Sequence, residues 1–127
     1  MANTITTIKA REKFAKAHGG TAPLPAITHV GWGTGGHNAA TRLPIPPTGD
    51  VNIIPGEIHK KAITGIEYPI PTTLRIFVDL KYVESGDTEI SCCGLYDADG
   101  DLVAWKTFKP KAMDEETTLE IDWDEQF

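Results

Sequence analysis

The sequence predicts a mainly β protein of the α+β class, in which one N-terminal helix packs with an antiparallel β-sheet or sandwich. Apolar and polar residues alternate through the second half of the chain, glycine and proline turns separate the runs, and no helical pattern intervenes. Strands joined by such short turns pair antiparallel. For 127 residues we expect a single domain, residues 1–127. It divides into an N-terminal helix within residues 1–20, a short strand with Gly/Pro-rich loops at 21–56, and antiparallel β structure at 57–127.

The N-terminal helix is expected over residues 2–18, where the chain contains no glycine or proline. Asn3 or Thr4 is the expected N-cap, because a short polar side chain at that position accepts a hydrogen bond from the first turn. Gly19 and Gly20 then predict the end of the helix. The apolar residues form only a loose stripe, so we expect the helix to depend on a partner surface.

Residues 21–56 are expected to form one short strand followed by irregular chain. The strand covers residues 27–32, and the glycines between positions 31 and 36 form a loop. The proline-rich passage "AATRLPIPPTGDVNIIPGE" then runs over the surface. A connection of this length without regular structure usually has a function or contacts a partner.

From residue 57 onward the sequence has the period of two that is typical of strands. The clearest strand is "TLRIFVDLKYVES", in which one face is formed by Leu74, Ile76, Val78 and Leu80. A turn is expected at residues 85–87. In the last strand the residues that face the core are Leu119, Ile121 and Trp123, and the acidic residues between them face water.

The stretch "CGLYDADGDLVAW", residues 93–105, has two possible structures, and the first is a calcium loop. Asp97, Asp99 and Asp101 alternate as they do at the start of such a loop. An EF-hand also needs a glycine at position 6 and a glutamate at position 12. When the loop is counted from Asp97, those positions are Leu102 and Phe108, so the calcium loop is disfavoured.

The second possible structure is a β-hairpin, and we expect this one. Asp-Gly at residues 99–100 is a favoured pair for a two-residue type I′ turn, in which both residues have positive φ. That turn places Leu95 opposite Ala104 and Asp97 opposite Leu102.

Other patterns that suggest a cofactor or a metal lack the surrounding structure that such a site needs. "GWGTGG" at residues 31–36 matches the dinucleotide motif, but prolines at 46 and 47 bar the helix that should follow. The histidines show no metal-ligand spacing; they are His18, His29, His37 and His59. We therefore expect neither a cofactor nor a metal, although one histidine per subunit could converge on the axis of an oligomer.

The cysteines and carboxylates give no support to catalysis. Cys92 and Cys93 are adjacent, so in a strand they point to opposite faces, and two free thiols are expected rather than a strained disulfide. Cys93 lies within an expected strand and not at a helix N-terminus that would lower its pKa. The acidic residues near the C-terminus belong to a solvated turn and strand, so we expect no enzyme.

Composition excludes further classes of protein. The net charge is −6, and the basic residues do not gather into the positive stripe that a nucleic-acid binder needs. No apolar run approaches the roughly 20 residues that span a bilayer. No signal peptide is recognisable near Met1, so folding in a cytoplasm is expected.

The stretch "GLYDADGDLVAW" closely resembles a signature of the phage tail-collar fibre family, the N-terminal attachment domain of tail fibres. In that family a strand with Gly-Leu-Tyr-Asp turns at Asp-Gly and returns as a strand of small and apolar residues. The order of an N-terminal helix, a strand like "ITHVGWGTGG", a proline-rich passage and a strand like "EIHKKAITGI" is also similar. The likeness in order covers most of the chain, and its specific part is residues 94–104.

The chain departs from the family pattern at two places. Thr34 stands where the family has an acid in the glycine loop. The family continues into a long fibre shaft, whereas this sequence stops at Phe127. The sequence therefore corresponds either to an attachment domain without a shaft or to the anchor of a longer fibre.

The resemblance implies a structural component of a phage or phage-like tail. Such a component attaches a tail fibre to the baseplate or acts as an adaptor, is located in the virion after synthesis in the bacterial cytoplasm, and is often a trimer. Its partners would be other tail proteins, without nucleic acid or membrane insertion. The residues expected to dock on the partner lie in unusually apolar loops; they are Trp32, Leu43, Pro44, Ile45, Pro46 and Pro47.

The alternative function is a receptor- or carbohydrate-binding module of a tail tip. Sugar sites stack aromatic rings against the sugar, and the candidate rings are Trp32, Trp105 and Trp123. Trp105 and Trp123 fall on strand faces that are expected to point inward, which weakens this alternative.

Overall fold

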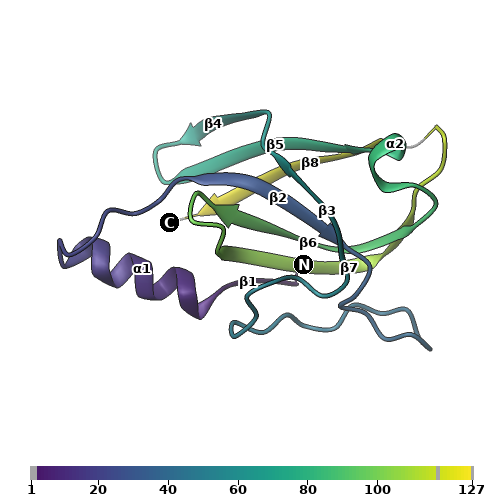
Figure 1. The fold of residues 1–127 in the computed structure, drawn as a ribbon, viewed down its shortest axis with the longest axis horizontal. Helices are drawn as coiled ribbons and strands as arrows, with labels where there is room; N and C mark the ends of the chain where they lie inside the picture. The colour runs from purple at the N-terminus through teal and green to yellow at the C-terminus, as the bar shows by residue number, and fades with distance from the viewer. Residues whose placement is uncertain (1–2, 117, 127) are drawn as a thin grey trace.

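The computed structural model describes residues 3–116 and 118–126 and shows two antiparallel sheets and one long helix (Figure 1). One sheet has the strand order β1-β7-β6-β2-β3, and the other has the order β4-β5-β8. The strands are β1 (Asn3–Thr6), β2 (Ile27–Gly33), β3 (Glu57–Ala62), β4 (Gly65–Ile70), β5 (Thr73–Lys81), β6 (Glu89–Asp97), β7 (Leu102–Ala112) and β8 (Thr118–Gln126). The helices are α1 (Ile8–His18) and the single turn α2 (Tyr82–Ser85). The expected fold class, mainly β with antiparallel sheets and an N-terminal helix, is confirmed.

The N-terminus differs from the expectation of a helix over residues 2–18, because its first described residues form strand β1. β1 pairs with β7, with Ile5 opposite Trp105. The N-cap is Thr7, not Asn3 or Thr4: its side chain accepts a hydrogen bond from the Ala10 amide at 3.1 Å. Thr4, Ile5 and Thr6 are β-branched and fit a strand better than a helix. The expected end of the helix at Gly19 is confirmed.

The main core lies between the two sheets. The alternation expected in β5 and β8 holds over most of each strand: Ile76, Val78, Leu80, Ile121 and Trp123 are buried, while Leu74 and Leu119 are partly buried against the same core. They pack against side chains of the five-stranded sheet that include Val30, Trp32, Cys93 and Leu95. Ala10 and Phe14 of α1 pack against the same core. The helix therefore has the partner surface that its weak amphipathicity required.

A second, smaller core lies on the outer face of the five-stranded sheet, beneath the connection between β2 and β3. Ile54 in this connection is 1% exposed and packs with Tyr96, Leu102 and Trp105. The Tyr96 hydroxyl accepts a hydrogen bond from the Ile54 amide at 3.2 Å. The long connection was expected to run irregularly over the surface, and in the structure part of it also serves as a cover for the sheet.

Strand β6 lies at the centre of the five-stranded sheet and is covered on both faces. Cys93 belongs to the main core and Cys92 to the outer core, so the adjacent cysteines point in opposite directions, as expected. Both are free thiols, and burial raises the pKa of each to about 12. A thiol with this pKa stays protonated at neutral pH and is a poor nucleophile.

Candidate functional site

The stretch at residues 93–105 forms the expected hairpin, from the end of β6 to the start of β7. Leu95 lies opposite Ala104 as expected, but Tyr96, and not Asp97, lies opposite Leu102. The loop contains three residues, because the Asp97 amide donates to the Asp101 carbonyl at 3.0 Å and the Gly100 amide donates to the Asp97 carbonyl at 2.9 Å.

The expected type I′ turn at residues 99–100 is therefore wrong. A type I′ turn needs positive φ at both Asp99 and Gly100. Gly100 has a φ of 84°, but Asp99 does not have positive φ, because Arg42 is the one non-glycine residue that does in the described part of the chain. A type I turn followed by a left-handed glycine is the usual three-residue hairpin loop. The extra residue explains why the register changes between Leu95 and Tyr96.

The three aspartates of this hairpin do contact a cation, and that cation is the ammonium group of Lys13 from α1. Lys13 Nζ lies 2.6 Å from Asp97, 3.0 Å from Asp99 and 2.7 Å from Asp101. The Asp97 side chain is only 2% exposed and also accepts hydrogen bonds from the amides of Asp99 and Asp101. We call these three residues the aspartate cluster. Its contact with Lys13 joins the helix to the hairpin.

The electrostatics of the aspartate cluster match this contact. Burial by itself lowers the pKa of Lys13, but hydrogen bonds to the three carboxylates outweigh it and raise the pKa above its ordinary value. The hydrogen bond from Lys13 lowers the pKa of Asp101. The carboxylate oxygens lie within 4.8 Å of one another. Sequence reasoning noticed the aspartates but could not identify Lys13, which is 84 residues away from Asp97.

Trp32 was expected to be an exposed docking residue, and this expectation is wrong. Its side chain is 0% exposed and belongs to the main core. The flanking Gly31 and Gly33 suggested a loop, but both are part of β2, where Trp32 lies opposite Cys93. A side chain at Gly33 would come within 2.8 Å of Cys92 Sγ, so these glycines allow close packing. The dinucleotide motif requires a helix directly after the glycine run, and residues 34–56 contain no helix.

The other expected docking residues lie together on one loop, residues 43–47, which we call the apolar loop. Leu43 is 52% exposed and Ile45 is 50% exposed. Pro46 is exposed as well, while Pro44 and Pro47 are half-buried. The loop belongs to the connection between β2 and β3, part of which lies at the lower right of the molecule (Figure 1).

The backbone of the apolar loop is fixed although these side chains are exposed. The Ile45 amide donates to the Gly36 carbonyl at 2.8 Å, and Thr107 Oγ1 donates to the Ile45 carbonyl at 2.8 Å. Just beyond the loop, Trp105 Nε1 donates to the Thr48 carbonyl at 2.9 Å. A surface that is apolar and held in place in this way is suited to contact with another protein.

The histidines lie apart from the aspartate cluster. In the described residues, the one group of at least three potential metal ligands is the aspartate cluster. His37 instead pairs with Ser91, with 3.0 Å between His37 Nδ1 and Ser91 Oγ, a pair that the sequence did not suggest. Ser91 is fully buried and its hydroxyl donates to the Gly35 carbonyl. That proton is therefore directed away from the histidine, which is not the geometry of a nucleophile and its base.

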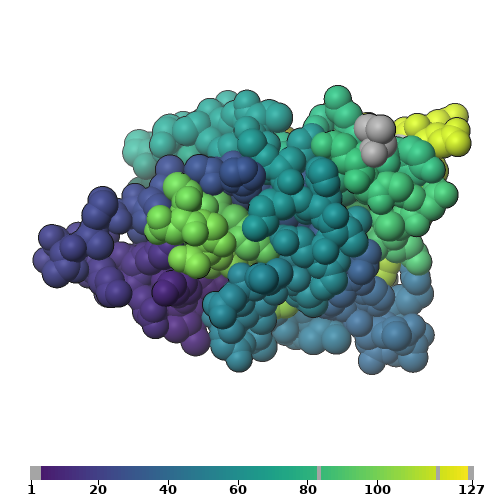
Figure 2. Space-filling view, in the orientation of Figure 1, coloured from purple at the N-terminus to yellow at the C-terminus, as the bar shows by residue number. Residues whose placement is uncertain are grey.

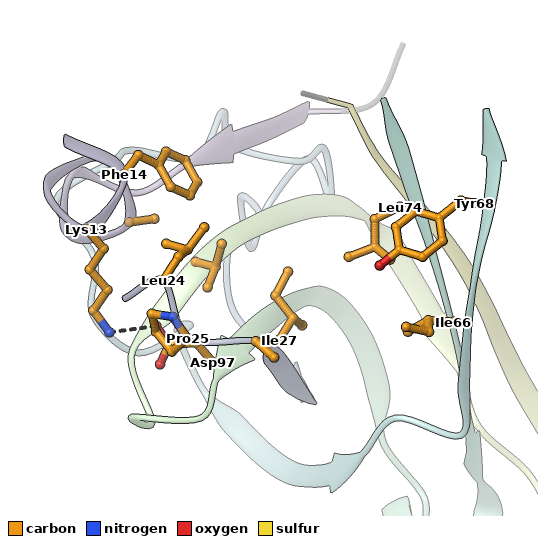
Figure 3. Close-up of a pocket in the computed structure, with 12 residues that line it drawn as sticks. Lys13, Phe14, Leu24, Pro25, Ile27, Ile66, Tyr68, Leu74 and Asp97 are labelled. Carbon is orange, nitrogen blue, oxygen red and sulfur yellow. Dashed lines mark hydrogen bonds and ion pairs between the residues drawn. The ribbon is translucent and has the colours of Figure 1, made fainter. Parts of the chain in front are cut away.

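An apolar cavity of about 260 Å³ lies between α1, the start of β2 and the strands β4 and β5. Figure 3 shows Phe14 and Leu24 on one side and Ile66, Tyr68 and Leu74 on the other. The charged groups at its margin, Lys13 and Asp97, are paired with each other. We call it the end cavity. Sequence reasoning missed it because it is formed by segments far apart in the chain.

No family model, no curated protein and no solved structure matches this chain. In the described part of the chain, no helix has the length and apolar character that crossing a membrane requires.

Proposed function

We propose that the protein is a non-enzymatic structural component of a phage or phage-like tail, which attaches a tail fibre to the baseplate or acts as an adaptor between them. It would be located in the virion and bind other tail proteins. The observation that carries the proposal is the apolar loop: Leu43 and Ile45 are each about half exposed on a backbone fixed by hydrogen bonds. Exposing these apolar side chains to water is unfavourable, and burying them against a protein partner is favourable.

The hairpin at residues 93–105 also supports the proposal. It contains the stretch that resembles the tail-collar fibre family, and the structure gives those residues a scaffold role. Tyr96 and Leu102 pack beneath the connection that carries the apolar loop, and Asp97 holds α1 through Lys13. The hairpin thus holds the helix and the connection in place, and an attachment domain needs a rigid scaffold of this kind. The trimeric state implied by the resemblance stays a prediction for the protein docked on the tail.

No observation favours the alternative, a carbohydrate-binding module. The rings named for that function are buried, with exposed fractions of 0% for Trp32, 5% for Trp105 and 3% for Trp123. A sugar could not stack on them without unfolding the core.

The proposal is tested by locating the protein on particles from cells that encode it. An antibody against the protein is expected to label one end of the tail in electron micrographs. The variant Leu43→Glu/Ile45→Glu is expected to fold normally but to be lost from particles at least about tenfold, because charge on a buried contact is strongly disfavoured. Asn52→Glu, at an exposed polar position of the same connection, is the matched control and is expected to be incorporated normally. Intact tails without label, or normal incorporation of the double variant, would contradict the proposal.

A further inference from the structure

Strand β4 is an edge strand whose outer side is open. It pairs with β5 on one side, and in the described part of the chain no strand pairs with its other side. It lies at the upper left margin of the molecule (Figures 1 and 2). Three of its apolar side chains are largely exposed: Ile66 at 52%, Tyr68 at 65% and Ile70 at 55%. Backbone groups on such an edge are available to another strand.

Exposed apolar side chains together with little charge distinguish β4 from the other edge strands. β8 carries exposed Glu120, Asp122 and Asp124, and β3 carries an exposed Lys60. β1 has no charged residue, but it has no large exposed apolar side chain among its described residues either. Charged residues of one sign keep two copies of the same edge apart.

The single charge on β4 is neutralised. Glu67 Oε1 lies 2.9 Å from Arg75 Nη1, and Arg75 also pairs with Asp124. In a protein with a net charge of −6, β4 is therefore an edge at which two copies can meet without bringing like charges together.

The sheet that contains β4 also leaves part of the main core uncovered. This sheet has three strands, whereas the sheet that it packs against has five. The end cavity opens beside β4, where a further strand of the smaller sheet would lie. Ile27 and Phe14 are only half-buried there, and Leu24 is 50% exposed. In Figure 3 the side chains of Ile66 and Tyr68 border this opening.

We propose that β4 pairs antiparallel with β4 of a second copy of this chain about a two-fold axis. The two three-stranded sheets then form one continuous sheet, and apolar side chains from each copy cover the end cavity of the other. Two-fold contacts of this self-complementary kind are the commonest in homo-oligomers. Pro69 has no amide hydrogen, so we place the ladder at residues 65–68, before the proline.

The expected dimer is weak, because the contact is small. One short strand and a few side chains bury less than the roughly 1,600 Å² of a standard interface. We therefore expect a dissociation constant on the order of 1–100 μM. The inference goes beyond the proposed function, because it concerns a surface distinct from the apolar loop.

Light scattering after size exclusion, over protein concentrations of about 1–500 μM, tests the pairing. The mass is expected to rise from 13.8 kDa toward twice that value with concentration. The variant Ile66→Lys/Tyr68→Lys places like charges on the edge and is expected to weaken the dimer at least about tenfold. Ile58→Lys, on the edge strand β3 of the five-stranded sheet at a side chain 40% exposed, is the matched control and should dimerise normally.

Amide hydrogen exchange separates strand pairing from contact between side chains alone. Exchange at residues 65–68 is expected to slow with concentration in the wild-type chain and in Ile58→Lys, and to stay fast in the double variant. A monomer at about 500 μM, or unchanged β4 exchange in the dimer, would overturn the inference. An oligomer unaffected by the double variant, including a trimer at three times 13.8 kDa, would also overturn it. None of these results affects particle labelling through Leu43 and Ile45, so the two proposals fail independently.

Discussion

Replacing Lys13 with methionine removes the cation from the aspartate cluster and keeps most of the apolar stem. The side chains of Lys13 and Asp97 are 16% and 2% exposed, so this contact approaches a buried ion pair. Removing one partner of a fully buried ion pair costs about 3–5 kcal/mol. Asp99 and Asp101 are 61% and 40% exposed, and such pairs are worth about 0–1 kcal/mol. We therefore expect Lys13→Met to lower the free energy of unfolding by about 3 kcal/mol, or roughly 10 °C in Tm for a chain of this length.

The effect of Lys13→Met should depend on pH. The pKa of Asp101 is lowered in the folded protein, so its contribution exists above its unfolded value of about 3.9 and is lost as pH falls through the folded value. The pKa of Lys13 is raised, so its contribution is complete below about pH 10 and is lost only as pH rises through the folded value. The difference between wild type and variant is therefore largest between about pH 5 and 9 and shrinks below about pH 4.

Urea denaturation followed by tryptophan fluorescence measures these differences. Lys16→Met, at an exposed position of the same helix, is the control and should change stability by less than about 0.5 kcal/mol. The double variant Lys13→Met/Asp97→Asn should cost less than the sum of the single changes, because both remove one shared interaction. Equal stabilities for the Lys13 and Lys16 variants, or a loss that persists unchanged at pH 3, would refute the role given to the aspartate cluster.

Three further predictions follow from burial and from the ion cluster. Trp32→Ala should lower the free energy of unfolding by about 3–5 kcal/mol in urea denaturation, and a loss below about 1 kcal/mol would mean that Trp32 lies outside the core. Cys92 and Cys93 should not react with a thiol reagent at pH 8 until the protein unfolds, since both are buried with pKa values of about 12; rapid native-state labelling would contradict this. Calcium at about 1 mM should leave the wild-type Tm unchanged, because Lys13 already contacts the three carboxylates; a rise of several degrees would show that the metal displaces it.

Most strands could be predicted from sequence because they show the local period of two. Of the four residues expected on the inner face of β5, Ile76, Val78 and Leu80 are buried in the core and Leu74 is half-buried. The errors arose where two local signals competed. The absence of glycine and proline favoured a helix from residue 2, whereas the β-branched Thr4 to Thr6 form β1. The hairpin was predicted, but its loop has one residue more than Asp99-Gly100 implied.

Features that depend on distant parts of the chain could not be predicted. Trp32 is flanked by glycines, which suggest a loop, and its burial follows from the packing of β5 and β8 against β2. Lys13 meets the aspartate cluster across more than 80 residues, and the end cavity joins α1 to β4. No periodicity within a single segment contains this information. Leu43 and Ile45 were placed correctly on the surface because prolines prevented regular structure around them.

The partners of the N-terminal segment have a consequence for synthesis of the protein. β1 pairs with residues 104–107 of β7, and Lys13 contacts residues 97–101, so these N-terminal residues contact segments that are synthesised more than 80 residues later. Until residue 105 has emerged, Ile5 lacks its cross-strand neighbour Trp105. Strand β1 is thus made well before its partner strand, and pairing across this sequence distance is a late step in forming the five-stranded sheet.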